Sequence, residues 1–246
     1  MNLFTVITVT YNAEHTLLRT LKSVQEQTYQ KIEHIIVDGK STDSTVQLIK
    51  QYKTKHTRWI SEKDNGIYDA MNKATAMAKG EYICYLNAGD AFYEKETAEK
   101  LIAIAKQYKH PDILFGETVI VDNKGKFLHN RRLKAPKRLQ WKSFKQGMLV
   151  CHQAFIIKRS LFQPYDLKYR FSADVDWCIR LMKQSKSIVN TQEVLIKYLN
   201  EGVTTANRKA SLKERFQIMR KHYGILSTML YHTWFVLRAI INPEKK

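Results

Sequence analysis

Cysteine is scarce in this chain, with three residues in 246 and no pair spaced as Cys-x-x-Cys. An odd count without such a pair argues against a disulfide scaffold and against a zinc ribbon. Glycine and proline are also few, at 9 and 4, and 44% of the residues are hydrophobic. These values exclude collagen-like and low-complexity chains, and the length is sufficient for one large domain with a buried core.

Hydrophobic runs long enough to cross a bilayer are missing as well. Near the C-terminus the longest stretch without formal charge, 222–237, has 16 residues, whereas a spanning helix needs about 20. The N-terminal residues show neither the basic segment nor the small-residue cleavage site of a secretory signal. We therefore expect a protein of a reducing compartment, the cytoplasm.

Acidic residues are absent from 123–165, a stretch that holds eleven Lys and Arg residues. The whole chain has a formal net charge of +18, yet residues 1–122 contain 15 basic and 16 acidic side chains. The positive charge is thus concentrated in the second half. Such asymmetry indicates a polyanionic partner, either nucleic acid, a phosphorylated substrate or an anionic membrane, and the alternative is a set of solvated lysine-rich surfaces.

The first half alternates β-branched segments with amphipathic ones. We expect strands at 3–10, 32–37, 59–60 and 81–86, separated by helices at 17–27, 46–52 and 70–78 and followed by one at 95–108. This alternation predicts an α/β fold with a mostly parallel central sheet flanked by helices.

After Pro111 the pattern changes to shorter strands and ends in a basic helical extension. We expect strands at 113–116, 118–121, 154–157 and 194–199, a hairpin turn at 123–126, a helix at 174–182 and a helical tail from about residue 211. The interpretation is one compact unit with two halves, 1–110 and 111–206, and a basic, apolar helical tail, 207–246.

Polar residues follow each strand expected in the first half. Thr10, Tyr11 and Asn12 follow the first, Asp38 the second, Asp64 the third, and Asn87 to Asp90 the fourth. Because ligands of parallel sheets bind at the carboxyl ends of the strands, these residues are predicted to line one binding edge.

Several ordered motifs in the first hundred residues resemble the opening of family 2 glycosyltransferases of the GT-A fold. The segments that carry the resemblance are 6–12 (VITVTYN), 23–29 (SVQEQTY), 33–45 (EHIIVDGKSTDST), 64–72 (DNGIYDAMN) and 80–83 (GEYI). The chain is most similar in these segments to bacterial capsule and exopolysaccharide enzymes of the colanic-acid type. The resemblance implies a GT-A fold and inverting transfer of a sugar to an acceptor hydroxyl, in bacterial surface polysaccharide synthesis.

The resemblance also implies partners for the two halves. The first half would bind a nucleotide-diphosphate sugar, with a UDP-sugar expected first, through Thr10, Tyr11, Asn12, Asp38, Asp64, Asn72, Asn87 and Asp90. Asp38 would contact the base, although an Asp followed by Ser41 and Thr42 is also typical of a turn cap. The basic second half would meet a lipid-linked or glycan acceptor.

A divalent cation, Mn²⁺ or Mg²⁺, is the cofactor that the resemblance implies. Segment 87–90 (NAGD) stands where the family has its D-x-D metal motif, with Asn87 in place of the first acid. Asp90 is therefore the expected metal ligand, because hard cations on phosphates require anionic oxygen ligands. The alternative is an ordinary turn aspartate.

Segment 172–177 (SADVDW) resembles the family's E-D-x-D segment beside the acceptor. Residue-by-residue matching puts the general base at Asp174, which would take the proton of the attacking hydroxyl. Asp176 is the second candidate, and both could instead be acids that complement a helix dipole. His152 and Gln153, in a family-like His-Gln-Ala segment, are expected substrate contacts.

Two other functions compete with this hypothesis. A sugar nucleotidyltransferase would have a Gly-rich basic loop after its first strand, where this chain has Thr10 to Ala13. A non-catalytic nucleic-acid-binding protein would fit the positive charge, but the sequence contains no nucleic-acid-binding motif, and we expect no nucleic acid as a partner.

The tail has basic residues at 208–221 followed by the apolar segment 225–237. This pattern is typical of a helix in a membrane interface and predicts attachment to the inner face of the plasma membrane. Packing on the core or on a second subunit is the alternative for the tail.

Overall fold

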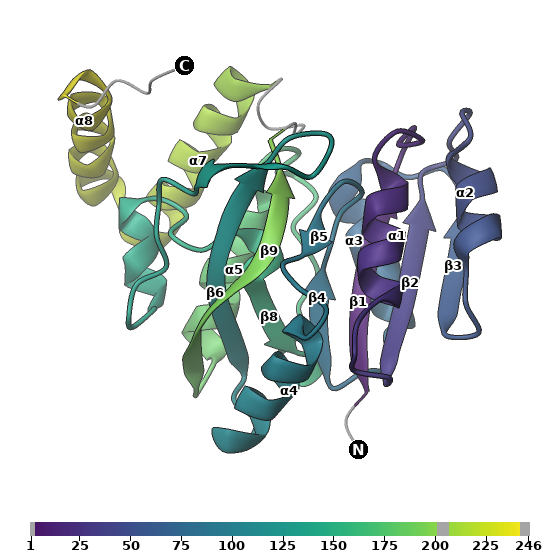
Figure 1. Ribbon diagram of the computed structural model, residues 1–246. Helices are drawn as coiled ribbons and strands as arrows, with labels where there is room; N and C mark the ends of the chain where they lie inside the picture. The colour runs from purple at the N-terminus through teal and green to yellow at the C-terminus, as the bar shows by residue number, and fades with distance from the viewer. Residues whose placement is uncertain (1–2, 201–206, 242–246) are drawn as a thin grey trace.

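The computed structural model describes residues 3–200 and 207–241, which form one nine-stranded sheet with helices on both of its faces (Figure 1). The strands are β1 (Phe4–Thr10), β2 (Ile32–Asp38), β3 (Thr57–Ser61), β4 (Tyr82–Tyr85), β5 (Ala91–Phe92), β6 (Ile113–Val121), β7 (Phe127–Asn130), β8 (Phe155–Lys158) and β9 (Ile188–Leu199). The helices are α1 (Leu17–Gln25), α2 (Thr45–Tyr52), α3 (Ile67–Met77), α4 (Thr97–Gln107), α5 (Ala173–Gln184), α7 (Arg208–Tyr223) and α8 (Ile225–Ile241), with short 3₁₀ turns η1 (Trp141–Gln146), η2 (His152–Ala154) and η3 (Arg159–Leu161). The predicted α/β class is confirmed.

The sheet has a parallel half and a mixed half. Its order is β3-β2-β1-β4-β8-β6-β9-β5, with β7 paired to β6. Strands β1 to β4 are parallel, as expected, whereas β8 is antiparallel to both β4 and β6. The expectation of a mostly parallel sheet therefore holds for the first half. In the second half β9 is parallel to β6, whereas β5, β7 and β8 are antiparallel to the strands they pair with.

The strand register aligns the carboxyl ends of the first strands at one edge of the sheet. Thr10 is opposite Asp38, and Asp38 is opposite Ser61. The turns beyond are tied together by the backbone, since the Gly39 amide donates to the Thr10 carbonyl at 2.9 Å and the Glu62 amide to the Asp38 carbonyl at 2.9 Å. The carboxyl ends of these strands are thus adjacent, as expected, and ligand binding at this edge stays a prediction.

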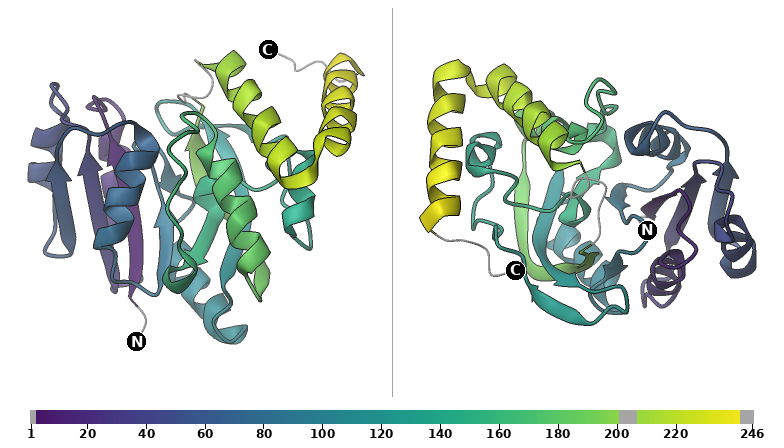
Figure 2. Two further views of the ribbon diagram at one scale, coloured as in Figure 1. Left: turned by 180° about the vertical axis from the view of Figure 1, so that it is seen from behind. Right: turned by 90° about the horizontal axis from the view of Figure 1, so that it is seen from above.

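Burial explains why the strands are β-branched. All seven residues of β1 and of β2 are buried, because α1 and α2 cover one face of the sheet and α3 covers the other (Figures 1 and 2). Strands buried on both faces are typically continuous runs of Val, Ile and Thr. Helix α5 lies on the same face as α3 (Figure 2), and these two helices carry the groups that face one another in the site described below.

Strand β6 differs from the prediction, because it is one strand of nine residues where two were expected around Gly116. A Cβ on residue 116 would lie 2.6 Å from the Glu193 carbonyl of β9. The glycine therefore marks the close approach of two strands and does not end the element. The expected boundary at 110/111 lies within one continuous sheet, and the boundary at 206 falls in 201–206, outside the described residues. The three-part division of the chain stays a prediction.

The helical tail consists of two helices that meet at Gly224, whose φ of +79° suits glycine. Helix α7 packs against α5, while α8 contacts α7 and η1 and extends from the body of the molecule (Figures 1 and 2). In the described ranges, no helix combines the length and the apolar composition needed to cross a membrane.

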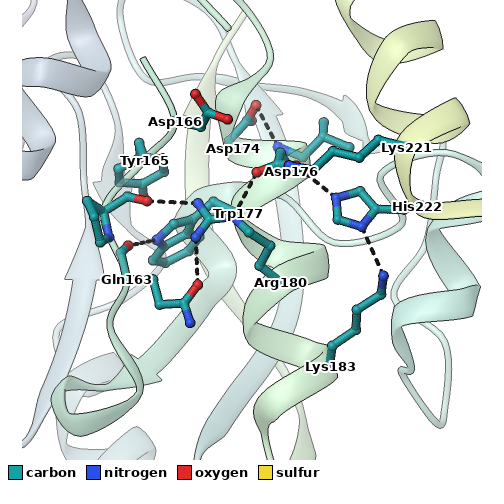
Figure 3. Close-up of polar contacts among 12 residues, drawn as sticks. Gln163, Tyr165, Asp166, Asp174, Asp176, Trp177, Arg180, Lys183, Lys221 and His222 are labelled. Atoms are coloured by element: carbon teal, nitrogen blue, oxygen red, sulfur yellow. Dashed lines mark hydrogen bonds and ion pairs between the residues drawn. The ribbon is translucent and has the colours of Figure 1, made fainter. Parts of the chain in front are cut away.

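A buried ion cluster fastens α7 to α5 (Figure 3). The Asp176 side chain has no exposed surface, and its carboxylate accepts from Arg180 Nε at 2.7 Å, from Lys221 Nζ at 2.9 Å and from His222 Nε2 at 2.8 Å. Burial alone would raise the pKa of Asp176, but the hydrogen bonds from His222, Lys221 and Arg180 outweigh it and hold the pKa well below its ordinary value of 3.8.

Replacing Asp176 with Asn keeps the shape and removes the charge that the cations share. We expect the free energy of unfolding at pH 7 to fall by roughly 3 kcal/mol, because a buried charge cluster loses one partner. A depressed carboxyl pKa stabilises the fold above its unfolded value and loses that effect as the pH falls toward its folded value. The difference in the free energy of unfolding between wild type and D176N should therefore be constant from pH 7 to 5 and become smaller below about pH 4.

Urea unfolding at these pH values measures the difference. The control is Asp166→Asn, whose carboxylate meets the half-exposed Lys168 ammonium at 2.7 Å and should contribute about 1 kcal/mol or less. A difference for D176N that is as large at pH 3 as at pH 7 would contradict the assignment of the stabilising charge to Asp176.

Candidate functional site

An exposed aromatic ring and a carboxylate lie side by side at the ends of β1 and β3. Tyr11 is 64% exposed. A Cβ on Gly39 would lie 2.5 Å from Asp64 Oδ2 and 3.3 Å from the Tyr11 ring. We call Tyr11, Gly39 and Asp64 the Tyr11 shelf. The shelf offers a ring face and a hydrogen-bond acceptor, and it leaves little room for a side chain at position 39.

The turn beside the Tyr11 shelf is held by polar contacts. Asp38 is fully buried and accepts from the Ser41 amide at 2.9 Å, from Ser61 Oγ at 2.6 Å and from Ser41 Oγ. Asn12, at a φ of +46°, accepts from the Thr42 amide at 2.9 Å through Oδ1. The observed contacts of Asp38 are those of a turn cap, and direct contact with a nucleotide base stays a prediction.

The turn after β4 departs from an acidic metal motif for a steric reason. Gly89 has a φ of +98°, and a Cβ there would lie 2.6 Å from Leu199 Cδ2. An aspartate at this position, the second acid of a D-x-D motif, would be both strained and overpacked. The acid that remains is Asp90, one position later.

Asp90 is buried and already hydrogen-bonded. Its carboxylate accepts from Gln153 Nε2 at 2.8 Å and from the Leu199 amide at 3.0 Å, and burial raises its pKa to about 7. The Arg19 guanidinium lies nearby and donates to the carbonyls of Gly89 and Asp122. The turn is therefore built by α1, η2 and β9 together.

Two buried oxygens beside this turn have no hydrogen-bond partner among the described residues, namely Thr10 Oγ1 on β1 and Asn87 Oδ1 after the neighbouring β4. Oxygen donors of this kind are the ligands that Mg²⁺ and Mn²⁺ accept. Asn87 Oδ1 is free to ligate, and Asp90 could do so after losing its proton and one hydrogen bond. In 3–200 and 207–241 no group of three or more His, Cys, Asp and Glu side chains is placed to hold a metal. The residues thus fit a hard cation that takes most of its ligands from phosphates.

A second carboxylate lies on the other side of the site, in the first turn of α5. Asp174 Oδ1 accepts from the Tyr68 hydroxyl of α3 at 3.0 Å and from the Val175 amide at 3.0 Å. Burial and the charge of Asp174 raise the pKa of Tyr68, so the phenol stays protonated and donates. One carboxylate with an oriented hydroxyl partner can accept a proton from a substrate.

One turn further along α3, Asn72 joins the two halves of the chain. Its Nδ2 donates to the Tyr165 carbonyl at 3.2 Å, and its Oδ1 accepts from the Tyr165 amide at 2.8 Å. Residues 68 and 72 share one face of α3 because they are four apart. Asn72 was expected to bind the donor, and the structure shows its amide occupied by this backbone contact.

His152 lies behind this contact in an aromatic cluster (Figure 3 shows Tyr165 and Trp177). Its Nε2 is 2.6 Å from the Tyr165 hydroxyl, and burial lowers its pKa to about 4, so the ring is neutral. Trp177 stacks on Tyr165 with ring centroids 4.8 Å apart. His152 and Gln153, expected as substrate contacts, are both buried, and substrate contact by either stays a prediction.

The predicted residues that follow β1 to β4 thus lie at one edge of the sheet, whereas Asn72 contacts Tyr165, His152 and Gln153 are buried, and Asp176 is bonded to α7. Their roles in binding and catalysis stay predictions. Tyr68, Arg19 and Tyr165 were not anticipated. The spacing of Tyr68 and Asn72 within the 64–72 motif, on one helical face, was the one pattern that could have indicated Tyr68.

Comparison with known proteins shows the family of this chain and agrees with its fold. Residues 5–165 match the model of the family described as Glycosyl transferase family 2. A PGL/p-HBAD biosynthesis glycosyltransferase of Mycobacterium bovis is 29% identical over 205 residues, 81% of this chain and 77% of that protein. The UDP-Glc:alpha-D-GlcNAc-diphosphoundecaprenol beta-1,3-glucosyltransferase of Escherichia coli is 22% identical over 250 residues, 99% of this chain and 94% of that protein. Among solved structures, S. aureus TarS in complex with UDP-GlcNAc superposes with a TM-score of 0.72 at 19% identity, covering 97% of this chain and 73% of that one.

Proposed function

The chain belongs to glycosyl transferase family 2, and from that premise we propose the reaction of this glycosyltransferase. It transfers a sugar, with inversion, from a UDP-sugar to a hydroxyl of a lipid-linked glycan in bacterial surface polysaccharide synthesis. The observation that carries the proposal is the hydrogen bond between Tyr68 and Asp174 at 3.0 Å. It places a carboxylate at the junction of the donor edge and the basic half. The similarity to the E. coli enzyme, whose acceptor is a diphosphoundecaprenol-linked sugar, supports the acceptor class.

The donor nucleotide is bound by the Tyr11 shelf. The exposed Tyr11 ring stacks on the base, and Asp64 Oδ2 accepts from a base or ribose donor group. Asp38 and Asn12 hold the turn between them, so that the shelf is formed before the donor arrives. A preformed site lowers the ordering cost of binding.

The diphosphate lies over the ends of β1 and β4, where Thr10 Oγ1 and Asn87 Oδ1 are unpaired. A divalent cation held there by Asn87 and Asp90 would neutralise charge on the leaving diphosphate. Asp90 with Gln153 and Arg19 fixes the shape of this turn.

Asp174 acts as the general base. The acceptor oxygen attacks the anomeric carbon as its proton passes to the Asp174 carboxylate, and the bond from that carbon to the diphosphate oxygen breaks. Attack opposite the leaving group inverts the anomeric centre. Tyr68 orients the carboxylate through its hydroxyl and leaves the other oxygen available to the acceptor.

The family membership weighs against both competing functions, the sugar nucleotidyltransferase and the nucleic-acid-binding protein. The positive charge of the second half instead suits an anionic membrane and a phosphate-bearing acceptor.

Helix α8 supports binding at a membrane surface. Its exposed apolar side chains are Ile225, Leu226, Met229, Leu230, Trp234, Val236 and Leu237, with Leu226 82% exposed. The adjoining η1 contributes Lys142 and Lys145, and Lys145 lies over the Tyr231 ring at 6.0 Å. An apolar face beside cations is typical of helices that lie in an anionic bilayer surface. A second copy of the chain would bring the same positive charge against it, which disfavours pairing through this face.

The assignment of the base predicts different outcomes at Asp174 and Tyr68. Asp174→Asn should fold and bind donor but lose about 10²–10⁴-fold in kcat, because it cannot take the proton. Tyr68→Phe keeps the base and loses only its orienting hydrogen bond, so kcat should fall by about tenfold. Transfer measured with a radiolabelled UDP-sugar and membrane extract tests both, and turnover by D174N within threefold of wild type would refute the mechanism.

The Tyr11 shelf predicts the cost of removing its ring. Tyr11→Ala should weaken UDP binding by about tenfold, since stacking of one base is worth about 1–3 kcal/mol. The control is Tyr108→Ala, which removes a ring that is 50% exposed at the end of α4. Thermal shifts with UDP, GDP, dTDP and CMP, with and without Mn²⁺, measure affinity and nucleotide choice. Equal UDP affinity in Y11A and Y108A would show that the uracil ring does not stack on Tyr11.

The membrane proposal predicts that α8 binds lipid and is dispensable for folding. The double variant L226S/L230S and a chain truncated after Tyr223 should keep the wild-type unfolding midpoint and lose sedimentation with phosphatidylglycerol vesicles. Phe127→Ser, which removes a 55% exposed ring on β7, should sediment like wild type. Unfolding of the truncated chain, together with no vesicle binding by the full chain, would assign the tail to the core.

A further inference from the structure

We propose that a pocket between the 166–171 loop and α7 binds the diphosphate group of the acceptor, an inference that rests on the proposed function. The pocket has a volume of about 450 Å³ and is lined by Lys168, Tyr169, Gln217, Arg220 and Lys221. None of the five is acidic, and each of the polar groups can donate a hydrogen bond. The lining therefore suits an anion with several acceptor oxygens.

The pocket's cations are held in place without being fully neutralised. Lys168 pairs with Asp166 at 2.7 Å and Lys221 with Asp176 at 2.9 Å. Arg220 forms no side-chain hydrogen bond or ion pair with any residue of the described ranges, so its guanidinium is available as a bidentate donor to phosphate.

Tyr169 forms the wall between the two lysines. Lys168 and Lys221 lie over its ring at 4.8 Å and 5.9 Å from the centroid. Glu214 is the nearby acid on α7. Its two carboxylate oxygens accept from the amides of Arg170 and Phe171 at 2.8 Å each, so both are already bonded to the loop backbone. The loop and α7 are thereby fixed to one another, and the pocket is preformed.

The pocket lies next to the helix that carries Asp174, the proposed general base. Lys221 is bonded to Asp176, which is two residues from Asp174 in the first turn of α5 (Figure 3). The pocket and Asp174 therefore belong to elements that pack against one another, α7 and α5.

The next element explains why the phosphate would belong to a lipid. Helix α8 begins directly after Gly224 and exposes its apolar side chains. An acceptor with its hydroxyl at Asp174 and its diphosphate at Arg220 would have its lipid chain leading toward this surface. A free phosphate and the headgroup of a membrane phospholipid present the same phosphate oxygens as the acceptor diphosphate. The experiment below therefore distinguishes these sources.

Titration calorimetry with inorganic pyrophosphate tests the pocket in full-length protein saturated with UDP, so that the donor site is blocked. We expect Arg220→Gln to weaken pyrophosphate binding by about tenfold and the double variant K168Q/R220Q to abolish it. Lys106→Gln, which removes an exposed charge from α4, should bind like wild type. Equal pyrophosphate affinity in R220Q and K106Q would overturn the proposal.

Two further arms identify the source of the phosphate. Farnesyl diphosphate should bind more tightly than pyrophosphate in wild type, and L226S/L230S should reduce that advantage. Phosphatidylglycerol vesicles should still bind R220Q, because α8 holds the bilayer. Loss of vesicle binding by R220Q with unchanged affinity for farnesyl diphosphate would overturn the proposal in favour of a membrane headgroup. Failure of the proposed function would be visible separately, as wild-type protein that does not bind UDP in the saturation step.

Discussion

One face of helix α3 holds the two halves of this glycosyltransferase in register. Tyr68 reaches the Asp174 carboxylate at 3.0 Å, and Asn72, one turn later, clamps both backbone groups of Tyr165. These contacts join residues that are 106 and 93 positions apart in sequence. They add directional polar contacts to the pairing of β4 with β8, which already joins the two halves in one sheet.

Three buried aspartates show how the same side chain takes different roles in different surroundings. Asp38 holds a turn through serine hydroxyls and an amide, Asp90 has a pKa raised to about 7 by burial, and Asp176 has a lowered pKa because His222, Lys221 and Arg180 donate hydrogen bonds to it. Only Asp174 combines a place in the first turn of α5 with a hydroxyl from the opposite half. The proposed base is thus distinguished by its neighbours, which are distant in sequence.

The sequence was sufficient to predict the α/β class, the parallel half of the sheet and the edge at which Thr10, Asp38 and Asn87 meet. These features follow from local periodicity and from the rule that parallel strands end together. The antiparallel β8, the partner of Asp174 and the ion cluster at Asp176 could not be predicted, because each depends on contacts between segments far apart. Lys221 was recognised only as part of a basic stretch and His222 only as the start of an uncharged one, and their shared partner is 45 residues or more away.

The turn at Asn87 to Asp90 has a consequence for how such enzymes diverge. Although it belongs to the first half of the chain, its carboxylate is held by Gln153 and Leu199 from the second, and the Leu199 side chain covers Gly89. The first hundred residues are therefore not a transferable cassette. A chimera that exchanged them between relatives would need to carry positions 153 and 199 along, so the two halves of the chain are constrained to change together.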